Sequence, residues 1–260
     1  FSHSARSVGI VSGQRLRHPL FVAGDMLFDT FSRSCRVGRL EPAGAMKWID
    51  VGTNIITVAS CGTDLVASVL LNGKLAGVRL DRAGHVSSML DGGAEINSPV
   101  CSTDGRALFY VERSRGFEIR RCELGKCKTL VATQGAALAL SPDGTRLAFI
   151  ELGNRGLFVR WINADGSGGV HDVMGLDAEC EPGWSSNKDL WVPLRQGKRI
   201  VWTEIDADTG RPTGRTSPGS RDCSNGSQDP LSPVTHDVQL QMSYRSEVRL
   251  LSSKYLPVRQ

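Results

Sequence analysis

The sequence predicts an all-β fold, a six-bladed β-propeller in which each blade has four antiparallel strands. Three observations support this prediction. A unit of about 42 residues recurs along the 260-residue chain, each unit contains short alternating segments typical of strands, and turns rich in Pro, Asp and Gly separate these segments. Because no segment has the 3.6-residue period of an amphipathic helix, we expect residues 1–260 to form a single propeller domain.

The repeat is clearest where an Asp-Gly turn precedes an apolar strand. The segment DGTRLAF at residues 143–149 corresponds to DGRALFY at residues 104–110, and weaker copies occur elsewhere. One Leu or Val of each copy serves as an anchor, and the anchors are Leu27, Leu65, Leu108, Leu147, Leu190 and Val238. A four-stranded propeller blade occupies roughly 40–45 residues, so six anchors at this spacing predict six blades.

The third and fourth units show the order of strands within a blade. The turn Pro142-Asp143-Gly144 separates a short innermost strand from the next strand outward, because Pro fixes φ and Gly supplies a positive φ. The strands predicted in the fourth unit are Ala136–Leu140, Arg146–Leu152, Leu157–Asn163 and Val170–Val173. Those predicted in the third unit are Ile96–Val100, Ala107–Glu112, Phe117–Cys122 and Lys126–Val131.

Closure of the ring requires an outer strand for the last blade, which begins near Asp229. Strands are predicted at Val238–Tyr244 and Glu247–Leu251, and the alternating segment Ala5–Val11 is suited to join them. Such pairing of the two chain ends would remove the exposed edges of the ring. The segment Asp206–Asp229, rich in Gly, Ser, Pro, Thr and Asp, is predicted to be an extended hairpin followed by an interblade loop.

The chain has seven cysteines, and two of them lie on one predicted hairpin. If Leu124-Gly125 is a two-residue turn, Cys122 faces Cys127 as a pair without backbone hydrogen bonds, with Cα atoms about 4.5 Å apart. We therefore predict a Cys122–Cys127 disulfide and an oxidising compartment, either periplasmic or extracellular. The alternative is a pair of buried thiols in a reduced protein.

The sequence SPDGTRLAF at residues 141–149 resembles the TolB-type, WD-like propeller repeats of bacteria, which also form the propellers of prolyl-oligopeptidase-like peptidases. The resemblance covers about Glu95–Met174, and the other units fit by spacing and turn chemistry. The hairpin with two cysteines also resembles extracytoplasmic propellers of some bacterial serine/threonine kinases, which would imply a sensor domain. Because the chain opens on Phe1 without an apolar signal region, we interpret it as a mature or excised piece of a longer product, which the resemblance implies is bacterial.

The charge pattern argues against two classes of partner. The formal net charge is +4, and the densest basic cluster, around Arg120 and Arg121, is interrupted by Glu112, Glu118 and Glu123. We interpret this cluster as a solvated strand face, since a nucleic-acid site would need a larger positive bias and stacking aromatics. The apolar stretches are far shorter than the ~20 residues of a membrane-spanning helix. We expect no nucleic-acid partner, no membrane insertion and a monomer.

Polar residues recur near the start of the innermost strands, where the strands of a propeller converge on its axis. We predict a ligand-binding channel mouth formed by Asn54, Glu95, Asn97, Asp177 and Glu179. Oxygen ligands of this kind suit a hard cation such as Ca²⁺, and six-bladed calcium-dependent lactonases have a similar set. The alternative interpretation is the polar lining of a water-filled channel.

No catalytic motif accompanies the repeat. The sequence lacks the G-x-S-x-G, H-E-x-x-H, phosphate-loop and dinucleotide-binding patterns, so we predict no catalytic residue and no cofactor. The peptidases that share this repeat carry their catalytic serine in a separate domain. We therefore predict a non-catalytic module that binds a protein or peptide on its rim. The alternative is a calcium-dependent lactonase or esterase with Glu95, Asn97 and Glu179 as metal ligands.

Overall fold

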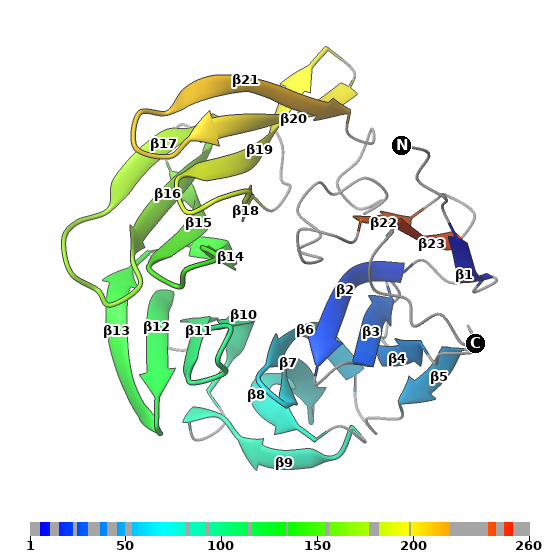
Figure 1. The fold of residues 1–260 in the computed structure, drawn as a ribbon. Coiled ribbons are helices and arrows are strands. Elements are labelled where there is room, and N and C mark those ends of the chain that lie inside the picture. Colours follow the sequence, from blue (N-terminus) through cyan, green and yellow to red (C-terminus); the bar gives the residue numbers. More distant parts are fainter. Residues whose placement is uncertain are drawn as a thin grey trace.

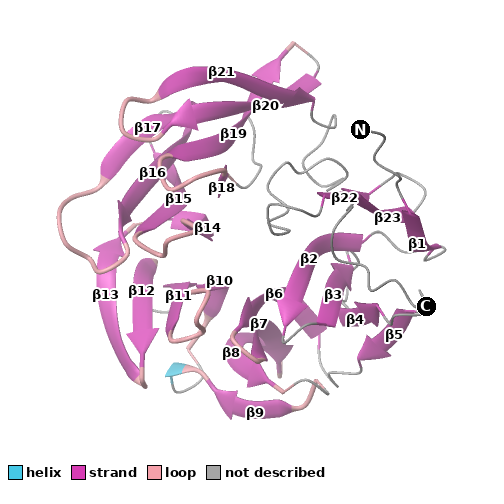
Figure 2. Ribbon diagram, viewed as in Figure 1, coloured by secondary structure: helices cyan, strands magenta, loops and turns pink. Residues whose placement is uncertain are grey.

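The computed structural model describes the backbone of residues 6–10, 16–22, 25–30, 37–40, 46–49, 54–218, 239–242 and 247–251, apart from short gaps at 82–83, 92–93, 114–115, 134, 154–155, 177–181 and 198. Side chains are described for most residues between 55 and 216. The described elements are overwhelmingly β-strands joined by short turns (Figure 2). Within these residues no helix is long and apolar enough to cross a bilayer.

The strands form successive antiparallel sheets of four. The first two sheets contain β2 (Leu16–Val22), β3 (Asp25–Thr30), β4 (Val37–Leu40) and β5 (Met46–Ile49), then β6 (Asn54–Cys61), β7 (Asp64–Leu71), β8 (Lys74–Leu80) and β9 (Val86–Met89). The next contains β10 (Ile96–Cys101), β11 (Ala107–Glu112), β12 (Glu118–Glu123) and β13 (Lys126–Ala132). In each sheet the strands pair in chain order, so each sheet is an antiparallel meander.

Two further four-stranded sheets follow the same order. One contains β14 (Gly135–Leu140), β15 (Arg146–Gly153), β16 (Gly156–Asn163) and β17 (His171–Leu176), and the other β18 (Gly183–Trp184), β19 (Asp189–Gln196), β20 (Arg199–Asp206) and β21 (Arg211–Pro218). The strands predicted in the third and fourth units are confirmed, with most ends within a residue or two of those observed. The predicted Asp206–Asp229 segment contains the turn into β21, and its part beyond Pro218 lies outside the described residues.

A last sheet contains strands from both ends of the chain. β1 (Arg6–Ile10) pairs with β23 (Glu247–Leu251), which pairs with β22 (Gln239–Met242). The sheets are arranged around a common axis, with β6, β10 and β14 on the inner side and β9, β13 and β17 on the outer side (Figure 1). This is the arrangement of propeller blades.

The anchor residues occupy equivalent places in the five sheets where they are described. Leu65, Leu108, Leu147 and Leu190 are each the second residue of the second strand of their sheet, and Leu27 is the third. Leu65, Leu147 and Leu190 are at most 1% exposed. Leu147 and Leu190 pack in cores shared by neighbouring sheets, which is why a single unit would leave an apolar face in water. Val238 lies outside the described residues.

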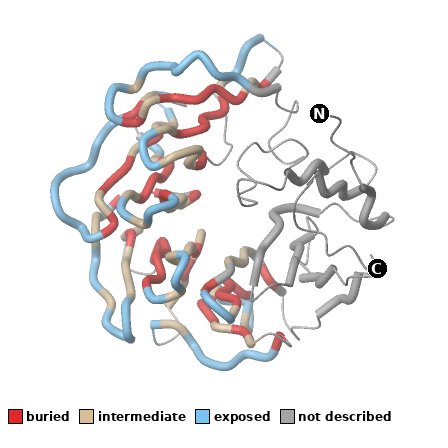
Figure 3. The backbone as a smooth tube through the Cα atoms, in the orientation of Figure 1, coloured by how far each residue is buried: buried red, intermediate tan, exposed pale blue. Residues whose placement is uncertain are grey.

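The hydrophobic core lies between the blades, on the inner and middle strands. β11 is buried along its whole length, whereas every residue of the outer strand β9 is exposed. Figure 3 shows the same gradient from the buried inner strands to the exposed outer edge. One core cluster contains Phe109 and Ile119 of one sheet and Phe149 and Ile162 of the next. Packing between consecutive sheets therefore holds the blades together.

One charged cluster differs from the sequence interpretation. Glu112 is 1% exposed, and its Oε2 lies 2.5 Å from Nη1 of Arg120, which also pairs with Asp91 at 2.9 Å. The next sheet repeats the arrangement with an ion pair between Glu151 and Arg160. The interpretation of Arg120 and Glu112 as part of a solvated face was therefore wrong, because buried charges in this fold are satisfied by pairing between adjacent strands.

The β12–β13 hairpin has the predicted register. Glu123 pairs with Lys126 and Cys122 with Cys127, and the turn residues Leu124 and Gly125 both have positive φ, at 50° and 77°. A disulfide joins Cys122 to Cys127 across the strands. Positive φ at both central residues is the geometry of a type I′ turn, whose twist matches that of a two-residue hairpin.

A second disulfide joins neighbouring sheets. Cys61 at the end of β6 is bonded to Cys101 at the end of β10, and the Cα atoms lie 5.1 Å apart. The turns that follow these two strands also touch, because a Cβ added to Gly105 would lie 2.7 Å from the Cα of Gly62. The junction between the β6–β9 and β10–β13 sheets is therefore closed by a covalent bond and by close backbone packing.

Candidate functional site

The structure describes three of the five residues predicted at the channel mouth. Asn54 is the first residue of β6, Glu95 directly precedes β10, and Asn97 is the second residue of β10. Both strands are innermost in their sheets, as predicted. Asp177 and Glu179 lie outside the described residues.

One of the predicted metal ligands, Asn97, has a hydrogen-bond partner in the protein. Asn97 is partly buried, and its Oδ1 accepts a hydrogen bond from the backbone N–H of Ser98 at 2.8 Å. This bond belongs to an irregularity of β10, where Ser98 has a positive φ of 48°. Among the described residues, no group of three or more His, Cys, Asp and Glu side chains is placed to hold a metal ion. A calcium site therefore remains a prediction.

Two equivalent turns form the most regular polar feature of the structure. In the β10–β11 turn, Asp104 Oδ1 accepts hydrogen bonds from the hydroxyl of Ser102 at 2.6 Å and the N–H of Arg106 at 3.0 Å. In the β14–β15 turn, Asp143 Oδ1 accepts from the hydroxyl of Ser141 at 2.7 Å and the N–H of Thr145 at 3.0 Å. The Asp of each Asp-Gly sequence thus stabilises the backbone of its own turn.

The serine of each turn completes the motif. Its hydroxyl accepts a hydrogen bond from the strand that follows, at 2.9 Å from Ala107 N in one turn and 2.9 Å from Arg146 N in the other. The Ser-x-Asp pattern at residues 102–104 and 141–143 is the sequence signal for this network, and at residues 141–144 it forms part of the predicted Ser-Pro-Asp-Gly corner. The two turns are therefore rigid and present similar polar groups.

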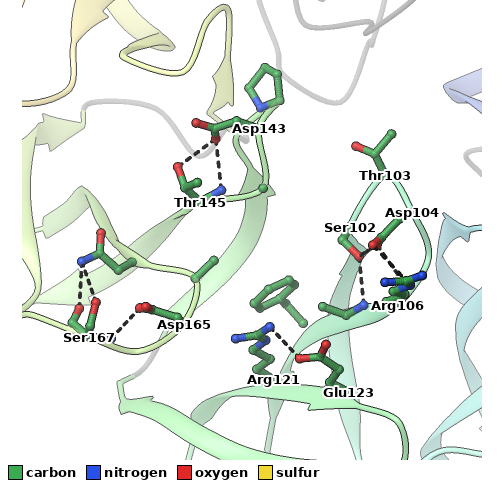
Figure 4. A pocket seen from close by; sticks show the side chains of 16 residues that line it. Ser102, Thr103, Asp104, Arg106, Arg121, Glu123, Asp143, Thr145, Asp165 and Ser167 are labelled. Atoms are coloured by element: carbon green, nitrogen blue, oxygen red, sulfur yellow. Dashed lines mark hydrogen bonds and ion pairs between the residues drawn. The ribbon is translucent and has the colours of Figure 1, made fainter.

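A cavity of about 610 Å³ lies between the β10–β13 and β14–β17 sheets, at the end of the sheets that carries these turns (Figure 4). Its walls are the two turns and the β16–β17 turn, with Asn163, Asp165 and Ser167, and its other lining residues include Phe109 and Arg121. The volume is within the range of small-ligand sites. Sequence reasoning placed the candidate site at the channel mouth and missed this cavity, because its walls come from turns of different units.

The lining of the cavity contains more acidic than basic groups. Asp104, Asp143, Asp165 and Glu123 contribute carboxylates, and Arg106 and Arg121 contribute guanidinium groups. Both arginines have acidic partners. Arg121 Nη2 lies 2.7 Å from Glu123 Oε2, and Arg106 Nε lies 3.7 Å from Asp104 Oδ2. Among the described residues, no ion pair joins either lining arginine to Asp143 or Asp165.

Hydrogen bonds keep the three aspartates ionised. The hydroxyl of Ser102 and the N–H of Arg106 lower the pKa of Asp104, and the N–H and hydroxyl of Ser167 lower the pKa of Asp165. At Asp143 partial burial opposes ionisation, but the bonds from Ser141 and Thr145 outweigh it and the pKa is lowered. Donors that favour the charged form of a carboxyl have this effect.

The charge of Asp143 leads to a prediction about stability in acid. A carboxyl with a depressed pKa in the folded protein contributes stability above its unfolded pKa, here near 3.8, and loses that contribution as the pH falls through its folded pKa. Asp143→Asn should therefore lower the melting temperature at pH 7, and the gap from the unmodified protein should close below about pH 4. Thermal unfolding from pH 7 to pH 3 measures the gap, and a gap independent of pH would contradict the prediction.

No family model matches the chain, and no curated protein matches its sequence. Solved structures do match the fold. The crystal structure of TolB from Acinetobacter baumannii has a TM-score of 0.64 and 17% identity over 80% of this chain. The fold is a β-propeller. The chain spans 56% of the length of that TolB structure, so only part of TolB corresponds to this propeller.

Two other structures similar to this propeller have different functions. A gluconolactonase from Xanthomonas campestris has a TM-score of 0.59 and 15% identity, and the match covers 84% of this chain and 83% of that one. A chain of a nidogen/laminin complex has a TM-score of 0.58 and 13% identity, with 78% and 80% covered. At these identities the likeness defines the propeller fold and leaves the function to the site.

Proposed function

We propose that the chain is a six-bladed propeller closed by the pairing of β1 with β23, and that it serves as a non-catalytic module for binding a protein or peptide on its rim. The observation that carries the proposal is the open, polar cavity between two blades, whose walls are turns made rigid by their own hydrogen bonds. Rigid turns on a packed scaffold allow recognition with little loss of conformational entropy on binding.

The chemistry of the cavity favours recognition over catalysis. The described residues that line it include no His, Cys or Lys, so a general base among them would have to be a carboxylate. The three aspartates have lowered pKa values. A general base is most effective when its pKa lies near the working pH, and these groups are therefore weak bases at neutral pH. The same ionised groups are good partners for a charged ligand.

Two disulfides support an extracytoplasmic location. Cys61–Cys101 and Cys122–Cys127 each join strands that are already adjacent in the fold. Disulfides of this kind persist in oxidising compartments, and we propose the periplasm or the extracellular space. A sensor propeller of a longer bacterial protein, such as a serine/threonine kinase, would be one form of this function. Similarity to TolB and to a chain of the nidogen/laminin complex is in agreement with a binding propeller.

The second candidate function is a calcium-dependent lactonase. The observation in its favour is the gluconolactonase match, which covers more than four fifths of both chains. Glu95, Asn97 and Glu179 would be the metal ligands, and Ca²⁺ would supply electrostatic stabilisation of a developing oxyanion. In the described part of the chain, the Oδ1 of Asn97 already accepts the Ser98 N–H, so the side chain has limited capacity for a cation.

Calcium titration separates the two functions. We expect isothermal calorimetry with CaCl₂ up to about 10 mM to give no saturable heat, because weak sites of extracellular modules bind at roughly 0.1–1 mM. We also expect no hydrolysis of gluconolactone. Glu179→Ala should leave both results unchanged. Saturable binding together with lactone hydrolysis, both abolished by Glu179→Ala and retained in Asp206→Asn, would instead establish the lactonase.

The binding function has its own test. A random peptide library displayed on phage, selected on the immobilised propeller, should give sequences that bind with reproducible dissociation constants in fluorescence anisotropy. The selected peptides should remain intact after prolonged incubation with the protein. Failure to select any saturable binder, under conditions that succeed for a control propeller, would contradict the proposal.

A further inference from the structure

The ends of the sheets that carry the Asp-Gly turns are joined differently at successive junctions. Between the β6–β9 and β10–β13 sheets, the Cys61–Cys101 disulfide and the close approach of Gly62 to Gly105 join the ends directly. Between the β14–β17 and β18–β21 sheets, the N–H of Asp143 donates to Asn187 Oδ1 at 3.0 Å, and Arg146 pairs with Asp208 at 2.9 Å. Both of these junctions are closed by direct contacts.

The junction between the β10–β13 and β14–β17 sheets is different. Near the axis, the N–H of Ala137 donates to the hydroxyl of Ser98 at 3.1 Å, and near the outer edge Lys128 Nζ donates to the carbonyl of Asp165 at 2.5 Å. The cavity of about 610 Å³ lies at this junction, at the level of the turns. The β10–β11 and β14–β15 turns therefore line this cavity (Figure 4), whereas direct contacts join the turns at the two junctions described above.

The cavity has acceptor capacity that the protein itself does not use. All hydrogen bonds to the side chain of Asp143 in the described part of the chain end on Oδ1, from Ser141 and Thr145, so Oδ2 can accept from a ligand. The Oδ1 of Asp165 accepts a hydrogen bond from the N–H of Ser167. Two cations, Lys128 and Arg121, act electrostatically on Asp165, and the Lys128 ammonium group donates to the backbone carbonyl of Asp165. With both lining arginines paired to carboxylates, the cavity favours a cationic ligand over a neutral or anionic one.

We propose that this cavity binds the guanidinium group of an arginine side chain from a partner polypeptide. The inference rests on the proposed function as a peptide-binding module and names the chemistry of the group that it recognises. A guanidinium is planar and offers five N–H donors in a fixed fork, which suits paired hydrogen bonds to carboxylates. An ammonium group is a compact point charge that is strongly hydrated, and it would be held less well in so wide a cavity.

Amide NMR provides a direct readout, because the carboxylates of the cavity are themselves hydrogen-bonded to backbone N–H groups. The amides of Arg106, Thr145 and Ser167 donate to Asp104, Asp143 and Asp165. Titration of the ¹⁵N-labelled protein with the peptide acetyl-Gly-Arg-Gly-amide should shift these three resonances with one common dissociation constant. The Thr209 amide donates to Asp206 in a similar turn outside the cavity and should not move.

Matched ligands identify the recognised group. The same peptide with citrulline in place of arginine keeps the shape and loses the charge, and we expect it to bind at least about tenfold more weakly. The lysine peptide should also bind more weakly than the arginine peptide. Agmatine carries the guanidinium without a peptide backbone. An equal dissociation constant for agmatine would overturn the assignment to a polypeptide side chain, and equal binding of the citrulline peptide would overturn the role of the charge.

Matched variants locate the site. The double variant with Asp143→Asn and Asp165→Asn should weaken binding of the arginine peptide at least about tenfold, whereas Asp206→Asn should leave it unchanged. Retention of the dispersed amide spectrum shows that each variant is folded. Undiminished binding by the double variant, or no shift of the three amides at 10 mM peptide, would overturn the proposal. If library peptides bind while the arginine peptide does not, only this inference fails; if neither binds, the proposed function fails as well.

Discussion

Gly105→Ala should lower the free energy of unfolding by about 2–4 kcal/mol, and Gly144→Ala by only about 1 kcal/mol. The two glycines occupy equivalent turns and have nearly the same φ, at 71° and 73°. An alanine at either position has the same left-handed strain. At Gly105 the new Cβ would also lie 2.7 Å from the Cα and N of Gly62, which are backbone atoms, whereas at Gly144 nothing lies within 4 Å.

Because the strain is common to both variants, their difference isolates the packing of one blade against the next. Equilibrium unfolding in urea measures both values. The slope of the unfolding free energy against urea concentration should be unchanged if each variant exposes the same surface area on unfolding. Equal destabilisation by the two substitutions would show that the turns at Gly62 and Gly105 do not touch in solution. It would also remove one of the two closed junctions with which the cavity is compared.

Removal of the Cys61–Cys101 disulfide by Cys→Ala substitution at both positions should cost about 4 kcal/mol, and removal of Cys122–Cys127 about 2 kcal/mol. The difference follows from loop length, because the first bond closes a separation of 40 residues and the second a separation of 5. A loss of about 4 kcal/mol is a large part of the 5–15 kcal/mol that typically stabilises a folded domain.

Urea unfolding of the two double variants, each compared with the unmodified protein under non-reducing conditions, tests this order. Dithiothreitol should lower the midpoint of the unmodified protein and should have little effect on a variant that lacks both bonds. A larger loss from the Cys122–Cys127 pair than from the Cys61–Cys101 pair would contradict the loop-length argument. Free-thiol counting in the denatured, unreduced protein measures how many cysteines are bonded, and the count should rise by two when either disulfide of the unmodified protein is reduced.

The local sequence predicted most of the strands and turns of the third and fourth units. The Asp-Gly turns and the alternating strands after them predicted β11 and β15 to within a residue, because turn chemistry and strand alternation depend on neighbours in the chain. The Cys122–Cys127 register followed from a two-residue turn in the same way. The closure of the ring and the residues Asp177 and Glu179 remain predictions.

The sequence alone determined the repeat, the strands and the turns, since each of these is specified within about one period of the chain. The tertiary structure decided which groups meet across periods. In the folded protein Cys61 is bonded to Cys101, the Glu112–Arg120 pair is buried, and a cavity lies between Asp104 and Asp143. Each of these depends on how closely two blades approach, and that distance is set by side chains from both blades. The candidate site therefore depends on the packing of two neighbouring blades, and the sequence of one unit does not specify it.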